Sequence, residues 1–366
     1  MSQHIRGALG AVFLLMSTTV LGAERFDVSN AAAYESTHRS LISTLLRSIS
    51  NESQRTNAMA QLRASTGEVA LTQICSDCTR VANNLMDSAE YEPSVWLYEP
   101  QGPNSLGDAD VLIAFPPVGE DREFPSVDAV SLDGRWLKLD GRMPPTVPVI
   151  VVRVNGRLSW ARQVASANAL LKQAGIQSLP ALQSLQRQSQ PMAAAGTGYW
   201  TTRLESIRLN DDEEPWISGD AEVYAVTSGV LPGNQAQVQI VDMPYLNDDG
   251  VTYSPRQIIL DWQDYSFGVA NIQLFEHDDG LNYRDLVAAI IAAIGGAGSL
   301  AGFPEITAVI EIANRILTAM PDSWLTNDDD YVDSLYTIEK TRGETNRAGA
   351  AGNAVVTYIP YELPPN

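Results

Sequence analysis

Apolar residues recur at helical spacing near the N-terminus and in short strand-like runs farther along the chain. Leu41, Leu45 and Ile49 lie at i, i+4 and i+8, which places them on one face of a helix. Residues 30–90 are therefore predicted to be mainly helical. Between residues 92 and 159 the apolar runs become short and end in turn residues, a pattern typical of strands. The predicted strands are 95–98, 111–115, 136–139 and 147–154.

Three signals follow this strand region. The dipeptide Asn155-Gly156 predicts a hairpin turn, because both residues tolerate positive φ. Residues 166–185 are predicted to be helical, with an interruption near Pro180, which cannot donate to a helical ladder. Residues 186–198 are rich in Gln, Ser, Ala and Gly, and are predicted to form a linker.

From residue 199 onward, alternation of apolar and polar residues predicts a second β region. The cleanest example is residues 270–274, Ala-Asn-Ile-Gln-Leu. Short strands separated by acidic loops favour an antiparallel sandwich. The predicted strands are 199–209, 221–228, 236–241, 257–262, 269–275, 332–339 and 354–358.

Two apolar helical segments, residues 283–294 and 305–320, interrupt this β region. A glycine-rich stretch at 295–302 separates them. The expected arrangement is a helical hairpin packed on the sandwich, since Glu311 and Arg315 give the second helix a polar side. The alternative is a hairpin that inserts into a membrane or a partner groove.

The predicted fold class is α+β. A mixed helical and β N-terminal domain covers residues 24–185, and the linker covers 186–198. An antiparallel β-sandwich then covers 199–366, with a helical hairpin insertion at 282–320.

The first 23 residues resemble a secretory signal peptide. Arg6 provides a positive charge, residues 8–20 are apolar, and Leu21-Gly22-Ala23 is a small-residue cleavage site. The apolar run is too short for a stable membrane span. The protein is therefore expected to be secreted or periplasmic.

The formal charge of −20 comes from 44 acidic and 24 basic residues. This surface argues against a nucleic-acid partner, because phosphates need neutralisation by Lys and Arg. It also disfavours docking on anionic lipid, so membrane contact is expected only through the 282–320 hairpin. The expected partner is a protein or a surface of unknown identity.

Cys75 and Cys78 are the two cysteines of the chain. In an exported protein they are expected to form a local disulfide. The alternative is a thioredoxin-like redox motif, which needs a strand before it and a helix after it within a βαβ unit.

Acidic residues cluster near the ends of the predicted strands of the second β region. Ca²⁺ binds six to eight oxygen ligands, and exported proteins meet it at high concentration, so the clusters predict a calcium site. The alternative is that these carboxylates are solvated turn residues that cap Asx turns. The acidic clusters at 211–214 and 248–249 contribute no proposed ligands. Residues 248–249 are predicted to lie in a turn. The proposed ligands are Asp220, Glu276, Asp278, Asp279, Asp328, Asp329, Asp330 and Asp333.

Catalytic signatures are scarce. The chain without its signal keeps two histidines, His38 and His277, and has neither an H-E-x-x-H nor a G-x-S-x-G motif. Whether the protein is an enzyme is left open. The preferred function is a non-catalytic, calcium-stabilised binding or surface module, and the alternative is a secreted hydrolase with its site between the two domains.

Several phrases of the chain resemble a family of secreted bacterial proteins that is catalogued only as a domain of unknown function. The resemblance implies no known activity. A more distant likeness links the C-terminal part to calcium-binding C2-type sandwiches, in which acidic loops at one end hold calcium; the helical insertion departs from that pattern. The phrases that carry the family resemblance are Trp96–Pro100, Glu222–Val226, Ile240–Leu246, Phe275–Asp279, Met320–Trp324 and Thr326–Asp333.

Overall fold

The computed structural model describes most of the chain between residues 31 and 363. The predicted signal peptide lies outside the described residues, and so does the predicted linker except for Gly198. The described residues are 31–65, 67–86, 91–100, 108–117, 125–154, 156–173, 198–211, 216–219, 221–232, 235–263, 265–276, 288, 290, 305–319 and 331–363.

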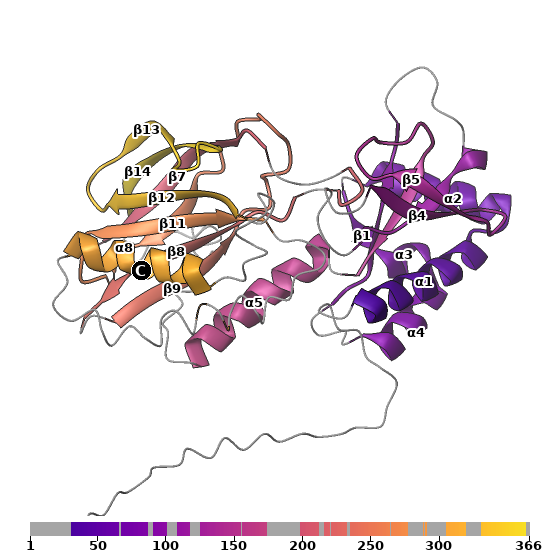
Figure 1. The fold of residues 1–366 in the computed structure, drawn as a ribbon, viewed down its shortest axis with the longest axis horizontal. Helices are drawn as coiled ribbons and strands as arrows, with labels where there is room; N and C mark the ends of the chain where they lie inside the picture. The colour runs from indigo at the N-terminus through magenta and orange to yellow at the C-terminus, as the bar shows by residue number, and fades with distance from the viewer. Residues whose placement is uncertain are drawn as a thin grey trace, which may run out of the picture.

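The N-terminal elements form a six-stranded sheet with helices beside it (Figure 1). The strand order is β1-β2-β6-β3-β4-β5, in which β3 and β6 are parallel and the other neighbours are antiparallel. The strands are β1 (Val69–Ala70), β2 (Ser94–Tyr98), β3 (Leu112–Ala114), β4 (Ser126–Ser131), β5 (Trp136–Asp140) and β6 (Val149–Arg153). The helices are α1 (Ala31–Ser48), α2 (Glu52–Ala64), α3 (Leu71–Ile74), α4 (Ser76–Leu85) and the 3₁₀ turn η1 (Asp108–Asp110).

Helix α1 packs its predicted apolar stripe against this sheet. Leu41, Leu45 and Ile49 are fully buried, and they share a hydrophobic cluster with Val95 and Ile150 from the strands. The helical periodicity of this region therefore predicted the correct buried face.

A segment from farther along the chain covers part of the opposite face of the same sheet. Ile217, which is fully buried, packs with Val149 and Val151 of β6. Beside it, the indole ring of Trp216 lies 5.1 Å from the ring of Tyr98. Residues 216–219 thus connect the C-terminal half of the chain to the N-terminal sheet.

Two four-stranded antiparallel sheets make up most of the C-terminal half. One has the order β10-β7-β14-β13, and the other has the order β12-β11-β8-β9. A single hydrophobic cluster contains side chains from both sheets, such as Ile207 from the first and Leu274 from the second. The strands are β7 (Tyr199–Leu209), β8 (Tyr224–Leu231), β9 (Gln235–Asp242), β10 (Gln257–Asp261), β11 (Val269–Phe275), β12 (Tyr331–Glu339), β13 (Glu344–Ala348) and β14 (Ala354–Leu363).

Helices α5 (Arg157–Gln173) and α8 (Glu305–Ala319) pack on the other face of the second of these sheets. Trp160 of α5 and Ile312 of α8 belong to one cluster with the buried strand residue Ile240. The amide of Asn168 in α5 also donates to the carbonyl of Ile240, at 3.2 Å. Figure 1 shows α5 running from the N-terminal group of elements to this sheet.

The position of α5 corrects two predictions. The helix expected at 166–185 begins at Arg157, directly after β6, and is described to Gln173. The carbonyl of Gly156 accepts hydrogen bonds from the backbone N–H groups of Ser159 and Trp160, so Gly156 begins a helix instead of a hairpin. Turn chemistry alone does not distinguish these outcomes, because a glycine also suits the start of a helix.

Other boundaries agree closely with the sequence. β7 and β11 have the predicted bounds, and the second helix of the proposed hairpin is present as α8. The first helix of that hairpin lies outside the described residues except for Ala288 and Ile290. Of the helices that the structure describes, none has both the length and the apolar character needed to cross a membrane.

Candidate functional site

One end of the second four-stranded sheet is formed by the last residue of β11 and the first residues of β8 and β12, next to the acidic segments of the sequence. Phe275, the last residue of β11, pairs with Tyr224 of β8 and with Tyr331 of β12. The Phe275 ring centroid lies 5.6 Å from that of Tyr224 and 5.9 Å from that of Tyr331. Because neighbouring strands are antiparallel, the chain leaves β11 at the end of the sheet where it enters β8 and β12. We use the name acidic sheet end for Tyr224, Phe275 and Tyr331, together with the residues that flank them in the sequence or pair with them across the strands.

The proposed metal ligands fall into two groups. Glu276 and Asp333 lie among the described residues. His277 is outside them, as are the remaining ligand candidates: Asp220, Asp278, Asp279, Asp328, Asp329 and Asp330.

Glu276 lies at the acidic sheet end and is fully buried. Its Oε1 accepts a hydrogen bond from the backbone N–H of Glu222, at 3.2 Å. This contact joins the segment that follows β11 to the segment that precedes β8. Two of the acidic segments are therefore tied together through described residues.

Asp333 has a different environment. Its Oδ1 accepts hydrogen bonds from the backbone N–H groups of Ser334 and Ala351, and its Oδ2 accepts one from Ala354, each at 2.7 Å. A Cβ at Gly349 would overlap this carboxylate, so only glycine fits there without a shift. Both oxygens of Asp333 thus accept backbone hydrogen bonds, and these bonds tie β12 to the loop after β13 and to the start of β14. Gly349 and Gly352 are the feature of the sequence that could have indicated a closely packed loop beside Asp333.

A buried ion network lies where the N-terminal sheet meets the C-terminal half. Arg153 Nη2 is 2.9 Å from Glu222 Oε2, and Arg153 Nη1 is 3.0 Å from Glu68 Oε1. Arg153 Nη1 also donates to the carbonyl of Ser218. The Arg153, Glu68 and Glu222 side chains are 1%, 4% and 0% exposed, respectively. We call these residues, with Ser218, the Arg153 network.

The sequence carried a signal for this network that was missed. Arg153 is the one charged residue in the apolar run of β6, and a charge inside a fully buried strand requires partners. In the structure Gly156 makes room for the network, because a Cβ there would come 2.5 Å from Glu68 Oε1. The identity of the partners could not be predicted, since they lie far from Arg153 in the sequence.

Asp242, the last residue of β9, adds a further carboxylate to the acidic sheet end. It pairs with Tyr224 of β8. Burial raises the pKa of Asp242, while the nearby Arg157 opposes this shift.

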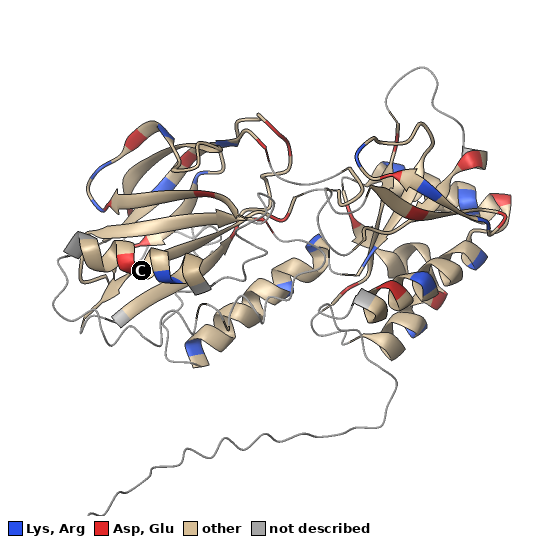
Figure 2. Ribbon diagram, viewed as in Figure 1, with Lys and Arg blue, Asp and Glu red and all other residues tan. Residues whose placement is uncertain are grey.

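The strands themselves contribute little charge here, since β8 and β11 contain no charged residue (Figure 2). The charge comes from residues at and beyond the strand ends. Among the described side chains, carboxylates outnumber guanidinium groups around this end of the sheet, which leaves a negative field that attracts cations. The carboxylates are those of Glu68, Glu222, Asp242 and Glu276, and the guanidinium groups are those of Arg153 and Arg157. Within the described ranges, however, no three His, Cys, Asp or Glu side chains are grouped so that they could hold a metal ion.

His38 is poorly suited to act as a general base. It is fully buried on α1, and its ring stacks on Phe115 with centroids 4.9 Å apart. Its Nδ1 lies 3.0 Å from the carbonyl oxygen of Tyr34. Burial lowers the pKa of His38 to about 3, so its neutral ring is a weak proton acceptor at neutral pH.

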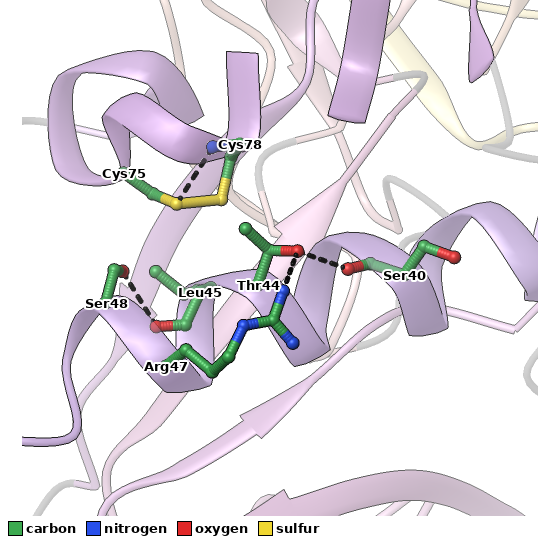
Figure 3. The surroundings of a disulfide bond; sticks show 7 residues. All are labelled: Ser40, Thr44, Leu45, Arg47, Ser48, Cys75 and Cys78. Atoms are coloured by element: carbon green, nitrogen blue, oxygen red, sulfur yellow. Dashed lines mark hydrogen bonds between the residues drawn. A yellow bond between two sulfur atoms is a disulfide. The ribbon is translucent and has the colours of Figure 1, made fainter. Parts of the chain in front are cut away.

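Cys75 and Cys78 form a disulfide at the start of α4, beside α1 (Figure 3). Both cysteines are 1% exposed. The Sγ of Cys75 accepts a hydrogen bond from the backbone N–H of Cys78, at 3.2 Å. This burial favours a structural role, because thiol–disulfide exchange requires access to a sulfur atom.

We expect the disulfide to resist dithiothreitol in native buffer and to be reduced rapidly in denaturant. Alkylation of the released thiols, followed by mass spectrometry, measures both rates. Reduction should lower the free energy of unfolding by about 2 kcal/mol, because the disulfide closes a very short loop. Equal labelling in native and denaturing buffer would instead support an accessible redox motif.

Comparisons with known proteins place the chain in a family. Searches of curated proteins and of solved structures returned no match. The model of one protein family covers residues 32–366, which is nearly the whole chain. The chain therefore belongs to the family described as "Protein of unknown function (DUF3103)".

Proposed function

We propose that this protein is an exported, non-catalytic binding module that calcium stabilises. In this proposal the N-terminal sheet and its helices form one domain, and the two four-stranded sheets form a C2-like sandwich. The 282–320 hairpin is an insertion held against the sandwich. The protein binds a protein or a surface, and does not bind nucleic acid.

The pairing of Phe275 with Tyr224 and Tyr331 carries this proposal. Asp278 and Asp279 lie within four residues of Phe275 in the sequence, Asp220 lies four residues before Tyr224, and residues 328–330 directly precede Tyr331. Short tethers to one sheet end favour convergence of these carboxylates. The negative field of the described residues supports a cation there, because calcium would offset carboxylate repulsion.

The packing of α8 argues against the alternative in which the 282–320 hairpin inserts into a membrane. Its apolar residues Val309, Ile312 and Ile316 are buried against the sheet, and the amide of Asn271 donates to the carbonyl of Val309 at 2.7 Å. A hairpin that inserted into a membrane would lose this contact area. We therefore propose that α8 stays on the sheet and that membrane contact, confined to 282–320, is not the main function.

Calcium is expected to raise the midpoint of thermal unfolding relative to EDTA. A ligand bound only by the native state stabilises it by about 2.7 kcal/mol at a hundred times its Kd. The measurement is a thermal melt in excess Ca²⁺, in EDTA, and in sodium chloride of equal ionic strength.

Two variants make the melt specific to the acidic sheet end. Asp278→Asn combined with Asp279→Asn should remove most of the calcium shift. Asp110→Asn, which removes an exposed acid of η1 in the N-terminal part, should keep it. Identical midpoints of the native chain in calcium and in EDTA would remove calcium from the proposal.

A further inference from the structure

His38 is fully buried in the first half of α1. Its ring contacts two others: the ring centroid of Tyr34, one turn earlier, lies 4.2 Å away, and that of Phe115, directly after β3, lies 4.9 Å away. The Tyr34 hydroxyl donates to the carbonyl of Pro116 at 3.4 Å. We call Tyr34, His38 and Phe115 the ring cluster. The ring cluster docks residues 31–39 of α1 on the end of β3.

The hydrogen bonds of His38 define which of its nitrogens carries the proton. Nδ1 lies 3.0 Å from the carbonyl oxygen of Tyr34, and a carbonyl oxygen only accepts hydrogen bonds, so Nδ1 is the protonated nitrogen. Nε2 is then a bare acceptor, and among the described residues this buried atom has no hydrogen-bond partner. A phenylalanine ring would fill the same space without a buried polar atom left unpaired, which costs free energy. Packing alone therefore does not account for a histidine here.

The elements around His38 do not favour a protonated ring. α1 packs against β3, β6 and α4. β3 contains no charged residue, and Arg153 is the one charged residue of β6. The other charged side chains of these helices lie at the surface, and they are those of Glu35, Arg39 and Arg47 in α1 and of Asp77 and Arg80 in α4.

Protonation of the ring at Nε2 would therefore bury a positive charge and a donor that lacks an acceptor. Burial lowers the pKa of the ring most, and Arg153 lowers it further, whereas the hydrogen bond to the Tyr34 carbonyl opposes them. The carboxylates of Glu68 and Glu222 do not offset this charge directly, because both are bound to Arg153.

We propose that His38 makes the docking of α1 sensitive to acid: when water protonates Nε2, residues 31–39 leave the end of β3. The released ring is hydrated, so its charge is no longer costly. This response uses neither the proposed calcium ligands nor the proposed binding role. It can therefore fail while those proposals stand.

The size of the response follows from the two protonation equilibria. The pKa of His38 is about 3 when the ring is buried, whereas an unperturbed ring has a pKa of 6.5. Between these pH values the released state binds one proton more than the docked state, so docking weakens as the pH falls. The ratio of released to docked chains should rise by about a hundredfold between pH 7.5 and pH 4.5.

Hydrogen exchange of the full chain tests this expectation. Mass spectrometry of peptides from residues 31–39 measures the ratio at each pH, after correction for the pH dependence of the exchange chemistry itself. Every sample contains EDTA, so that loss of calcium at low pH does not contribute. Peptides from β11, which contains no histidine, provide the internal reference.

Two variants assign the response to one ring. His38→Phe keeps an aromatic ring in the cluster and cannot titrate, so the ratio should change by less than about threefold over the same pH range. His277→Gln removes the other histidine of residues 24–366 and should keep the full response. Equal pH responses of the native and His38→Phe chains would overturn the proposal.

A second measurement serves if His38→Phe does not fold. Nuclear magnetic resonance of the native chain with ¹³C-labelled histidine follows the titration of His38 directly. The proposal predicts that the ring stays neutral while residues 31–39 are docked. Titration near pH 6.5 with these residues still protected from exchange would contradict it.

Discussion

Replacing Arg153 with methionine is expected to lower the free energy of unfolding by about 3–5 kcal/mol. The substitution leaves the carboxylates of Glu68 and Glu222 buried without the cation that lies 3.0 Å and 2.9 Å away in the native structure. It also removes the hydrogen bond to the carbonyl of Ser218, which fixes the segment that carries Ile217. Chemical denaturation of the full chain measures the loss.

Arg39→Met is a matched control for this prediction. Arg39 also pairs with two carboxylates, those of Glu35 and Asp128, but its side chain is 37% exposed. Its loss is expected to cost about 1 kcal/mol or less, because solvent screens exposed ion pairs. If Arg153→Met costs no more than Arg39→Met, the Arg153 network does not hold the two halves of the chain together.

A triple variant tests the reason for the loss. Arg153→Met with Glu68→Gln and Glu222→Gln should be more stable than Arg153→Met alone, because the glutamines leave no uncompensated buried charge. A triple variant that is less stable than the single one would show that packing of the arginine, and not charge pairing, dominates.

Replacing Asp333 with alanine is the second large effect, with an expected loss of about 3–5 kcal/mol. The change removes the acceptors of the backbone N–H groups of Ser334, Ala351 and Ala354, each now bonded at 2.7 Å. The hydrogen bonds of Ser334 and Ala354 are buried, and a buried N–H group without an acceptor is costly because it has lost its hydration as well. Gly349→Ala should also destabilise the chain, since a Cβ there would overlap the carboxylate.

Asp140→Ala is the comparison for Asp333. Asp140 accepts hydrogen bonds from the backbone N–H groups of Arg142 and Met143, at 2.8 Å and 2.9 Å, in an exposed turn. Water can replace that acceptor, so a loss of about 1 kcal/mol is expected. Equal losses for the Asp333 and Asp140 variants would contradict the structural role of Asp333.

Local patterns predicted much of the fold. The bounds of β7 and β11 follow from alternation along a half-buried sheet, and the stripe Leu41, Leu45 and Ile49 identified the buried face of α1. β4 and β13 were missed because Ser126–Ser131 and Glu344–Ala348 lack a clear run of β-branched or aromatic residues. Their pairing with neighbouring strands stabilises them more than their own residues do.

Interactions between segments that lie far apart in the sequence were harder to predict from the sequence. The sequence shows that Arg153 interrupts an apolar run, and it contains no information that selects Glu222 as the partner 69 residues later. Asp333 was predicted as a metal ligand from its place in an acidic cluster. The structure shows its oxygens accepting hydrogen bonds from the backbone N–H groups of Ser334 in β12, Ala351 in the loop after β13, and Ala354 at the start of β14. Carboxylate clusters in a sequence therefore indicate sites of interest without distinguishing a metal ligand from a backbone acceptor.

The calcium content of the native protein tests the central proposal most directly. The chain is purified without chelator, dialysed exhaustively, and measured by atomic emission. The proposal predicts about one bound Ca²⁺ ion per chain, retained by Asp110→Asn and lost from the chain that carries both Asp278→Asn and Asp279→Asn. A native chain with no more calcium than its dialysis buffer would contradict the proposal.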